Sequence, residues 1–374
     1  MPLPLRLAGF YFAFFVYAGA FVAYFPPYLE ARGLSAPQIA WVLALPHVAR
    51  VVAPAAWGWL ADRSGAHRGI VVFSCVANAA CFGTLPWVDG AAAVAGLVGA
   101  TSLLSAAALP LVEAITLTAL ASEPGRYGPI RLWGSFGFIA GVLAVGAWLD
   151  LRAADTLPAV LFGCCALSIA AALLLPAQRL RPAPAAAGAA MPPAAALVIA
   201  AGFFMAAAHG TLYTFFSLHL QHEGYGGAVI GLFWTLGVLA EIAVFFWLPA
   251  LFRRYALSTL LVASFACAVL RFVAIGWGAG FALVLFFAQL LHAATFGSFH
   301  AASVAAVQRS FPEHALGRGQ TLFTSLAYGA GGATGAVLAG WSWSAAGPAM
   351  AFTISSLVAA AGLFLVRRLK RHGI

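Results

Sequence analysis

Long apolar runs follow one another along the whole chain, separated by short stretches with polar and charged residues. Each run is close to the ~20 residues that a helix needs to cross the hydrocarbon core of a bilayer. The apolar/polar alternation typical of membrane β-barrel strands does not occur in these runs. We therefore predict an all-α membrane protein with twelve transmembrane helices, at residues 7–29, 37–61, 69–88, 92–121, 129–149, 157–177, 195–221, 227–252, 257–276, 279–308, 317–341 and 348–366.

One internal segment differs from the rest in composition. Residues 178–193 read QRLRPAPAAAGAAMPP, rich in Pro and Ala, and divide the predicted helices into six and six. This predicts an N-terminal six-helix bundle at 1–177, a cytoplasmic linker at 178–194 and a C-terminal six-helix bundle at 195–374.

The two halves also resemble each other. A gapless shift of 191 residues aligns Gly33 with Gly224 and Arg63 with Arg254, so loop glycines and cytoplasmic arginines keep their register. The same shift places Arg50 opposite Glu241, two opposite charges at the same depth of equivalent helices. Pseudosymmetric halves with a site near the bilayer midplane are typical of secondary transporters.

Composition and charge agree with a membrane location. The chain is 63% hydrophobic and 8% charged, whereas a soluble domain has about 25% charged residues. With the N-terminus inside, the cytoplasmic segments hold 15 of the 19 Lys and Arg, as the positive-inside rule requires. The net charge of +9 is therefore a topology signal rather than a nucleic-acid site, and it predicts that both termini are cytoplasmic. The five cysteines suggest neither a metal site nor a disulfide framework.

A charged turn follows the second predicted helix. Its residues resemble the helix 2–3 loop motif of the major facilitator superfamily, with His67 in place of the more usual basic residue. The resemblance implies a loop that helps to govern the inward–outward switch; the alternative is a turn that only anchors the helix. The motif consists of Gly58, Asp62, Arg63, Gly65 and Arg68.

Two further regions resemble the lactose permease and its relatives. PLVEAI and YGPIRLWGSFGF are similar to the helix 4–5 region, and this implies that Glu113 and Arg131 bind substrate. AVLRFVAIG and LLHAATFG are similar to the helix 9 and helix 10 segments that carry Arg271 and His292. The carboxylate that follows this histidine by one turn in the lactose permease is Thr295 here.

The strongest overall resemblance is to the phenylpropionate permease branch of the superfamily. HGTLYTFFSLHL, GLFWTLGVLAEIAVFFWLPALFRRY and LLHAATFGSFHAASVAAV look like helices 7, 8 and 10 of that branch. This implies proton-coupled symport, as uptake across a bacterial inner membrane, of a small organic solute such as the aromatic carboxylate 3-phenylpropionate. It also implies a protein that is not an enzyme, needs no cofactor beyond the proton gradient and is a monomer.

Charged side chains inside helices are the first candidate site residues. Placing one at a helix centre costs at least ~2.5–3.5 kcal/mol, so each should face protein or a watery cavity. Arg50 can bind a carboxylate bidentately, and Glu241 is a candidate proton site. The alternative is a set of static salt bridges that lock the helices together. The four residues are Arg50, Glu113, Glu241 and Arg271, whose formal charges cancel.

Histidines and aromatic residues complete the candidate set. Spacings of three and four place Gln289, His292, Phe296 and His300 on one face of a helix. His292 and His300 are proton-coupling candidates because His titrates near neutrality. Glu241 and Arg271 are the other two proton-coupling candidates. Gln289 and Phe296 are substrate-binding candidates, as are His209 and Tyr213 in helix 7 and Tyr17 and Tyr24 in an aromatic stripe of helix 1. This stripe either stacks on substrate or only packs.

Other functions remain open at this point. A sugar or nucleoside symporter, a proton-driven exporter and a membrane solute sensor all fit the same helices. An intramembrane enzyme is disfavoured, because no nucleophile triad, phosphate-binding glycine loop or clustered metal motif occurs. The expected partners are a small-molecule substrate, protons and the lipid bilayer.

Overall fold

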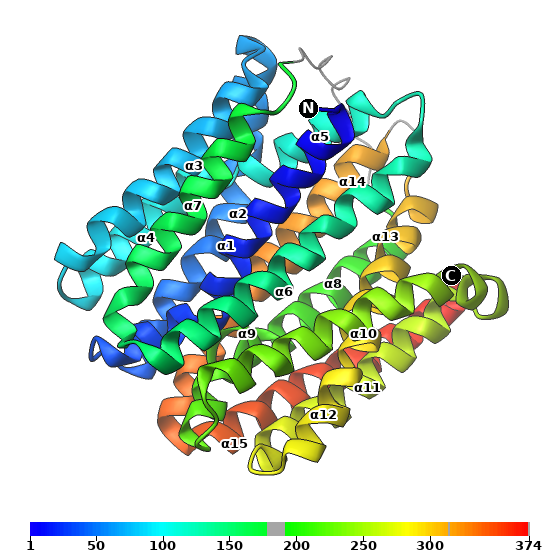
Figure 1. Ribbon diagram of the computed structural model, residues 1–374. Coiled ribbons are helices and arrows are strands. Elements are labelled where there is room, and N and C mark those ends of the chain that lie inside the picture. The colour runs from blue at the N-terminus through cyan, green and yellow to red at the C-terminus, as the bar shows by residue number, and fades with distance from the viewer. Residues whose placement is uncertain (178–190, 313–314, 373–374) are drawn as a thin grey trace. The chain divides into compact units, whose positions relative to one another are not determined.

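The computed structural model describes residues 1–177, 191–312 and 315–372, and Figure 1 shows them as a set of long helices. Within these residues the structure contains no strand, so the predicted all-α fold is confirmed. Most of the predicted linker, 178–194, lies outside the described residues. The α-helices are α1 (Leu3–Ala31), α2 (Ala36–Ser64), α3 (His67–Thr84), α4 (Ala91–Ser105), α5 (Ala108–Ala119), α6 (Tyr127–Leu151), α7 (Leu157–Leu173), α8 (Pro193–Ala208), α9 (Gly210–His222), α10 (Gly227–Arg254), α11 (Leu257–Gly278), α12 (Ala282–Leu290), α13 (Phe299–Ser310), α14 (Leu316–Phe323) and α15 (Gly332–Val366).

Eleven helical segments among the described residues are long and apolar enough to cross a membrane. The last one, Leu316–Leu369, has 54 residues, which is about 80 Å of helix at 1.5 Å per residue and far more than the ~30 Å hydrocarbon core. It contains a non-helical residue, Gly347, with φ of 81°. A side chain is strained in this left-handed conformation, and the following Pro348 cannot continue the hydrogen-bond ladder. The predicted ranges 317–341 and 348–366 both fall inside this segment.

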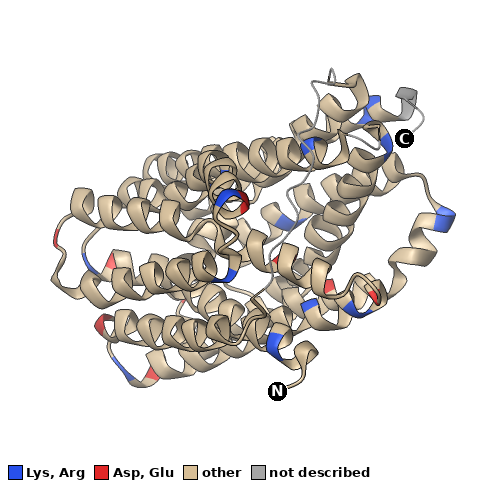
Figure 2. Ribbon diagram, turned by 90° about the horizontal axis from the view of Figure 1, so that it is seen from above, with Lys and Arg blue, Asp and Glu red and all other residues tan. Residues whose placement is uncertain are grey.

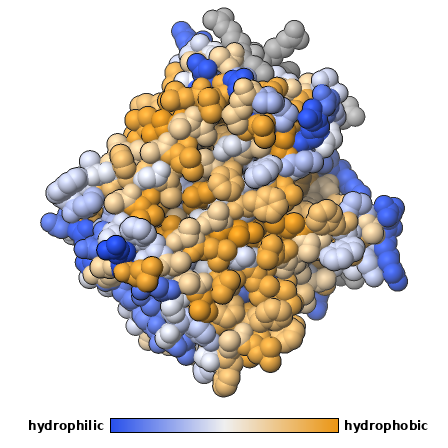
Figure 3. Space-filling model, viewed as in Figure 1, coloured by the Kyte–Doolittle hydropathy of each residue, from blue (hydrophilic) through white to orange (hydrophobic). Residues whose placement is uncertain are grey.

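The molecular surface is apolar over large areas. Trp59 is 62% exposed, Phe246 76% and Leu357 64%. Figure 3 shows hydrophobic residues over much of the visible face, and Figure 2 shows how few charged residues the helices carry. Exposed apolar patches of this extent mark a membrane-facing surface. The chain is therefore a multi-pass membrane protein.

The described helices form two compact units. Unit 1 comprises Met1–Ser35, Val52–Ala183 and Tyr225–Leu232, and unit 2 comprises Ala36–Val51, Pro184–Gly224 and Phe233–Ile374. Each unit is drawn mainly from one half of the sequence. The first part of α2 nevertheless belongs to unit 2, and the first part of α10 belongs to unit 1.

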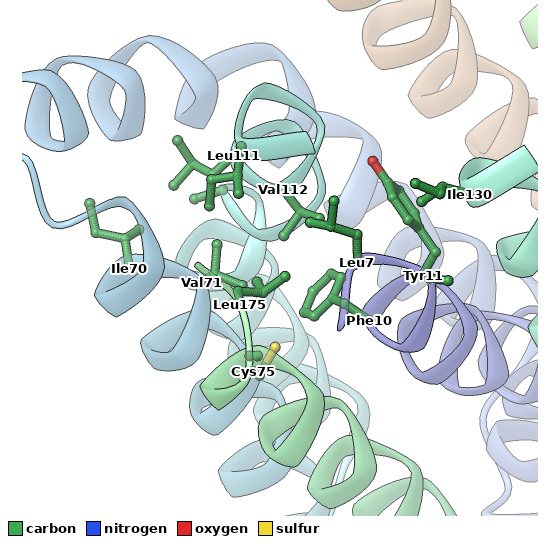
Figure 4. Packing of buried hydrophobic residues seen from close by; sticks show 14 of the residues in the cluster. Leu7, Phe10, Tyr11, Ile70, Val71, Cys75, Leu111, Val112, Ile130 and Leu175 are labelled. Atoms are coloured by element: carbon green, nitrogen blue, oxygen red, sulfur yellow. The ribbon is translucent and has the colours of Figure 1, made fainter. Parts of the chain in front are cut away.

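Unit 1 is built around α1, which packs along α6. A Cβ atom at Gly137 or Gly141 would overlap the backbone of α1, and one at Gly19 would lie 2.6 Å from the Phe138 carbonyl oxygen. Small residues thus allow the two helices to approach closely. At one end of the unit an apolar cluster joins α1, α3, α5 and α6, as shown in Figure 4. Its members include Leu7, Phe10, Val71, Cys75, Val112, Ile130 and Leu175.

Unit 2 contains two interruptions of regular α-helix that bear on the site. Ala293–Ser298 and Thr324–Gly331 are π-helical. π-Helices are rare and frequently occur at functional sites. The first joins α12 to α13, and the second joins α14 to α15.

Candidate functional site

A buried arginine forms the centre of unit 2. Arg271 of α11 is 1% exposed. Its Nη1 donates to His292 Nδ1 at 3.0 Å and to Thr295 Oγ1 at 2.9 Å, and its Nη2 donates to Gln289 Oε1 at 2.7 Å. Gln289 in turn donates from Nε2 to the Phe233 carbonyl oxygen at 2.9 Å. All three groups that accept from Arg271 are uncharged side chains.

His292 links this arginine to a carboxylate. Its Nε2 lies 3.6 Å from Glu241 Oε2, while its Nδ1 accepts from Arg271. An arginine can only donate, so the Nδ1 atom must carry no hydrogen. A neutral His292 therefore has its hydrogen on Nε2, directed at Glu241. Gly237 lies one turn before Glu241 on α10, and a Cβ there would lie 3.4 Å from the His292 ring.

His292, Phe296 and His300 form a row of three stacked rings along the first π-helix and the start of α13. The His292 and Phe296 centroids are 5.3 Å apart at an interplanar angle of 10°, and Phe296 and His300 are 6.3 Å apart at 10°. This arrangement agrees with the shared face predicted from the residue spacing. His300 Nδ1 then lies 2.8 Å from the hydroxyl oxygen of Tyr328.

Tyr328 lies in the second π-helix and also contacts α2. Its carbonyl oxygen accepts from His47 Nδ1 at 3.2 Å. A Cβ at Gly332 would overlap the His47 ring, so this glycine makes room for the histidine. Neither Tyr328 nor His47 was among the predicted site residues. The available signal was the position of His47 three residues before Arg50, one turn away on the same helix face.

Arg50 lies in the part of α2 that belongs to unit 2. Its side chain is exposed, and it interacts electrostatically with the hydroxyl groups of Tyr213 and Tyr328. Both tyrosines also interact electrostatically with Glu241. Arg50 and Glu241 therefore interact electrostatically with the same two tyrosines.

Aromatic rings of α9 and α10 lie beside these charges. The Tyr213 ring stacks on Trp234 at 6.2 Å and 16°, and on His209 at 5.9 Å and 29°. The Trp234 indole donates to Ser217 Oγ at 2.9 Å, which fixes its ring. His209 is 3% exposed, and its Nδ1 donates to the Met205 carbonyl oxygen at 2.8 Å. Tyr213 is half-buried and more accessible than His209.

Unit 1 contains the second predicted charge pair. Arg131 Nε lies 4.0 Å from Glu113 Oε1, and the two side chains are 32% and 39% exposed. The guanidinium also lies 4.5 Å from the Phe15 ring centroid and 5.5 Å from that of Tyr11. The structure thus brings Glu113 and Arg131 together, and both remain accessible. Their contact with substrate stays a prediction.

The two tyrosines predicted in helix 1 have different surroundings. Tyr24 is 3% exposed, and its hydroxyl lies 2.6 Å from the Val142 carbonyl oxygen and 2.9 Å from that of Gly227. Tyr17 lies 5.7 Å from the ring of Phe82 and 5.9 Å from that of Phe21, and is partly exposed. For Tyr24 these contacts favour the packing alternative. Tyr17 remains accessible for stacking.

The charged turn after α2 forms contacts with neighbouring elements. Asp62 Oδ1 lies 3.9 Å from His67 Nε2, and Arg68 Nη1 donates to the Leu175 carbonyl oxygen at 3.5 Å, just beyond the end of α7. Gly65 has φ of 65°, which a residue with a side chain rarely adopts. The Arg63 guanidinium lies 5.5 Å from the Trp59 ring centroid. A Cβ at Gly58 would meet no neighbouring atom. The switch role of this loop stays a prediction.

The structure thus divides the predicted site residues between the units. Within the described residues it shows no cluster of three His, Cys, Asp or Glu side chains that could hold a metal ion. Unit 2 brings together Arg50, His209, Tyr213, Glu241, Arg271, Gln289, His292, Phe296 and His300, and unit 1 contains Tyr17, Tyr24, Glu113 and Arg131. What the unit 2 arrangement can do chemically is hold a proton at a carboxylate beside a histidine of fixed tautomer and attract an anion to an accessible arginine.

Solved structures place this fold in a class. The chain aligns with the nucleoside transporter NupG at a TM-score of 0.82 and 17% identity, covering 99% of each chain. It aligns with a POT family transporter in complex with a thioalcohol conjugated peptide at a TM-score of 0.75 and 12% identity, covering 99% of this chain and 96% of that one. At these identities the similarity shows the fold alone, which is that of membrane transporters.

Sequence comparison defines the family. The model of the MFS_1 like family matches residues 4–354, so the chain belongs to this family of transporters and is not an enzyme. A probable 3-phenylpropionic acid transporter of Escherichia coli (strain K12) is 28% identical over 377 residues, 96% of each protein. A maltose permease of Geobacillus stearothermophilus is 39% identical over 146 residues, 38% of this chain and 36% of the permease.

Proposed function

We propose that this transporter takes up a small aromatic carboxylate together with protons, by alternating access across a bacterial inner membrane. The distribution of Lys and Arg supports cytoplasmic termini. The break at Gly347 supports two crossings within the 54-residue segment and hence twelve in all. The six-helix halves are 1–177 and 195–374, and the protein works as a monomer.

The observation that carries the proposal is the hydrogen bond between Arg271 Nη1 and His292 Nδ1, which sets the tautomer of His292. Because Arg271 occupies Nδ1, His292 cannot gain a proton there without losing this hydrogen bond. Its other nitrogen faces Glu241 at 3.6 Å. Of Glu241, His292 and His300, Glu241 is therefore the group that binds and releases the proton, and His292 is the neighbour that positions it. His300 contacts the Tyr328 hydroxyl, which can donate or accept, so this contact does not fix its tautomer, and His300 is the proposed second station on the same row of rings.

Arg50 is the proposed carboxylate-binding residue. Its guanidinium is accessible and can form a bidentate pair with a carboxylate. The Tyr213 and Tyr328 hydroxyl groups can donate to the same anion. Stacked rings at Tyr213–Trp234 and at His292–Phe296–His300 provide apolar faces for an aromatic ring. The printed substrate of the Escherichia coli relative, 3-phenylpropionic acid, has these two features, a ring and a carboxylate.

The charges of Arg50, Glu241 and the substrate explain how substrate binding is coupled to proton binding. Arg50 and Glu241 interact with the same tyrosines, so an anion bound at Arg50 reduces the positive field at Glu241. A reduced positive field favours a proton on Glu241. Substrate and proton therefore bind with positive cooperativity, and the net charge of Arg50, Glu241 and any bound anion is zero in both the empty and the loaded state.

A sugar symporter is the second candidate, supported by the maltose permease similarity. The accessible Glu113–Arg131 pair offers a carboxylate acceptor and a guanidinium donor to hydroxyl groups. A sugar would use this unit 1 pair and not require Arg50. The same assay distinguishes the two substrates.

Proteoliposomes with an internal pH dye test the proposal. Adding 3-phenylpropionate outside wild-type vesicles should acidify the interior, while maltose and a nucleoside should not. Glu241→Gln should abolish this acidification but retain exchange of labelled for unlabelled 3-phenylpropionate. Glu113→Gln, the matched control, should retain acidification in proportion to uptake. Full proton coupling in Glu241→Gln would contradict the proposed role of Glu241, and acidification by maltose alone would identify the sugar candidate.

A further inference from the structure

An acidic residue at one end of α6 holds the start of another helix. The Gly227 amide donates to Asp150 Oδ1 at 2.5 Å, and the Ala228 amide donates to Asp150 Oδ2 at 2.9 Å. Gly227 and Ala228 are the first two residues of α10. Their amides belong to the four at a helix start that have no acceptor within the helix. One carboxylate therefore caps α10 from a different helix.

The position of Asp150 is unfavourable for its own helix. It is the penultimate residue of α6, where the helix dipole is negative and a carboxylate is destabilising. The start of α10 offers the opposite end of a dipole. The electrostatic preference of Asp150 is thus satisfied by α10 and not by α6.

Two further contacts fix the same junction. The Tyr24 hydroxyl of α1 lies within hydrogen-bond distance of the Val142 carbonyl of α6 and the Gly227 carbonyl of α10, so it joins three helices. A Cβ at Gly227 would lie 2.6 Å from the Gly146 carbonyl oxygen, and one at Gly231 would lie 2.6 Å from that of Val142. The start of α10 and the end of α6 thus approach each other backbone to backbone.

The start of α2 also packs tightly against another helix of its unit. A Cβ at Gly340 of α15 would lie 3.1 Å from the Ala36 carbonyl oxygen and 3.2 Å from Pro37 Cα, at the start of α2. The start of α10 combines tight packing with the two charge-assisted hydrogen bonds from Asp150.

We propose that Asp150 is a releasable latch. Its two hydrogen bonds fasten the start of α10 to the end of α6 at the outer side of the membrane, and they break whenever that side opens. This inference rests on the orientation and the alternating-access function proposed above. Removal of the Asp150 carboxylate takes away two charge-assisted bonds, and loss of a helix cap shifts a local equilibrium by about tenfold. Opening at this end should become more frequent by about that factor.

Hydrogen exchange tests the latch without any substrate. In Asp150→Ala, amides of 225–232 should exchange about tenfold faster than in wild type, as measured by mass spectrometry in nanodiscs. Asp150→Glu should recover part of the protection. The control is Asp155→Ala, an acidic residue in the short helix Ala154–Thr156, and it should leave exchange in 225–232 unchanged. Equal exchange rates in Asp150→Ala and wild type would overturn the latch.

A cross-link tests whether release is needed for transport. In Asp150→Cys/Ala228→Cys, closure by oxidation or by a short bifunctional thiol reagent should reduce 3-phenylpropionate exchange more than tenfold, and a reductant should restore it. The two single-cysteine variants are the controls. Exchange at the wild-type rate in the cross-linked protein would overturn the releasable latch. If wild-type vesicles transport no aromatic acid, the proposed function fails, whereas the hydrogen-exchange result for Asp150 still stands.

Discussion

Arg271 in unit 2 and Arg131 in unit 1 reach a glutamate in two different ways. Arg131 approaches Glu113 directly at 4.0 Å, beneath aromatic rings, with about a third of each side chain exposed. Arg271 is 1% exposed and is linked to Glu241 through His292. A substrate contact must be accessible to a solute, whereas a proton site needs neighbours of fixed protonation. The same two residue types are therefore arranged for different tasks.

The largest difference between the two sites should be in stability. Arg271→Met leaves three buried acceptors without their donor, and we expect a loss of about 3 kcal/mol in the free energy of unfolding. Arg131→Met breaks a half-exposed pair and should cost less than about 1 kcal/mol. Thermal unfolding in detergent, followed by tryptophan fluorescence, measures both variants. Equal losses would mean that Arg271 is no more integral to its unit than Arg131.

The next largest effect should come from His292. His292→Leu removes both the acceptor for Arg271 and the polar neighbour of Glu241, and proton-coupled uptake should fall by about a hundredfold, the usual contribution of a proton-transfer group. His292→Gln keeps one acceptor and one donor and should remain within about tenfold of wild type. The exposed His222 provides a control, since His222→Leu should change little. If Leu and Gln at position 292 are equally harmful, the hydrogen-bond role of His292 is wrong.

A smaller effect is expected from the ring between the two histidines. Phe296→Leu removes two stacking contacts worth about 0.5–1.5 kcal/mol. The KM for 3-phenylpropionate should rise by roughly two- to tenfold. A non-aromatic carboxylate measured in the same vesicles should show no such change in KM. A similar rise for both solutes would contradict a role of this ring in recognising an aromatic group.

The smallest effect is expected at Phe15. Its ring supports the Arg131 guanidinium at 4.5 Å, a contact worth about 0.5–1 kcal/mol at an accessible site. Phe15→Leu should therefore raise KM by no more than roughly fivefold and leave the ratio of protons to substrate unchanged. A change in that ratio would show that unit 1 also takes part in proton coupling.

The helices themselves could be predicted well from the sequence. The predicted ranges 37–61 and 257–276 lie within α2 (Ala36–Ser64) and α11 (Leu257–Gly278), because the length of apolar runs is set by bilayer thickness. Interruptions inside the runs were not predicted. The break between α8 and α9 at His209 and the two π-helices occur inside long apolar runs. Hydropathy in such a run does not show how the backbone is wound.

The site was predicted in part. The spacing of His292, Phe296 and His300 predicted their common face, since periodicity within one helix is a local property. Contacts between helices depend on tertiary packing, which spacing does not give. For this reason Tyr328 and His47 were missed, and the acceptance of a hydrogen bond from Arg271 by Thr295 appears only in the structure. The assignment of α2 and α10 in part to the opposite units was likewise beyond the sequence.

The π-helical turn at Ala293–Ser298 has an evolutionary consequence. A π-turn holds more residues than an α-turn, so it can absorb a one-residue insertion in an older, regular helix without disturbing the residues on either side. Deleting Ala294 reverses such an insertion and restores regular winding, so His292 and His300, then seven residues apart, stay within about 20° of one another around the helix. The two histidines that bound the row of rings should thus keep their common face after the loss of a residue that is not one of the rings.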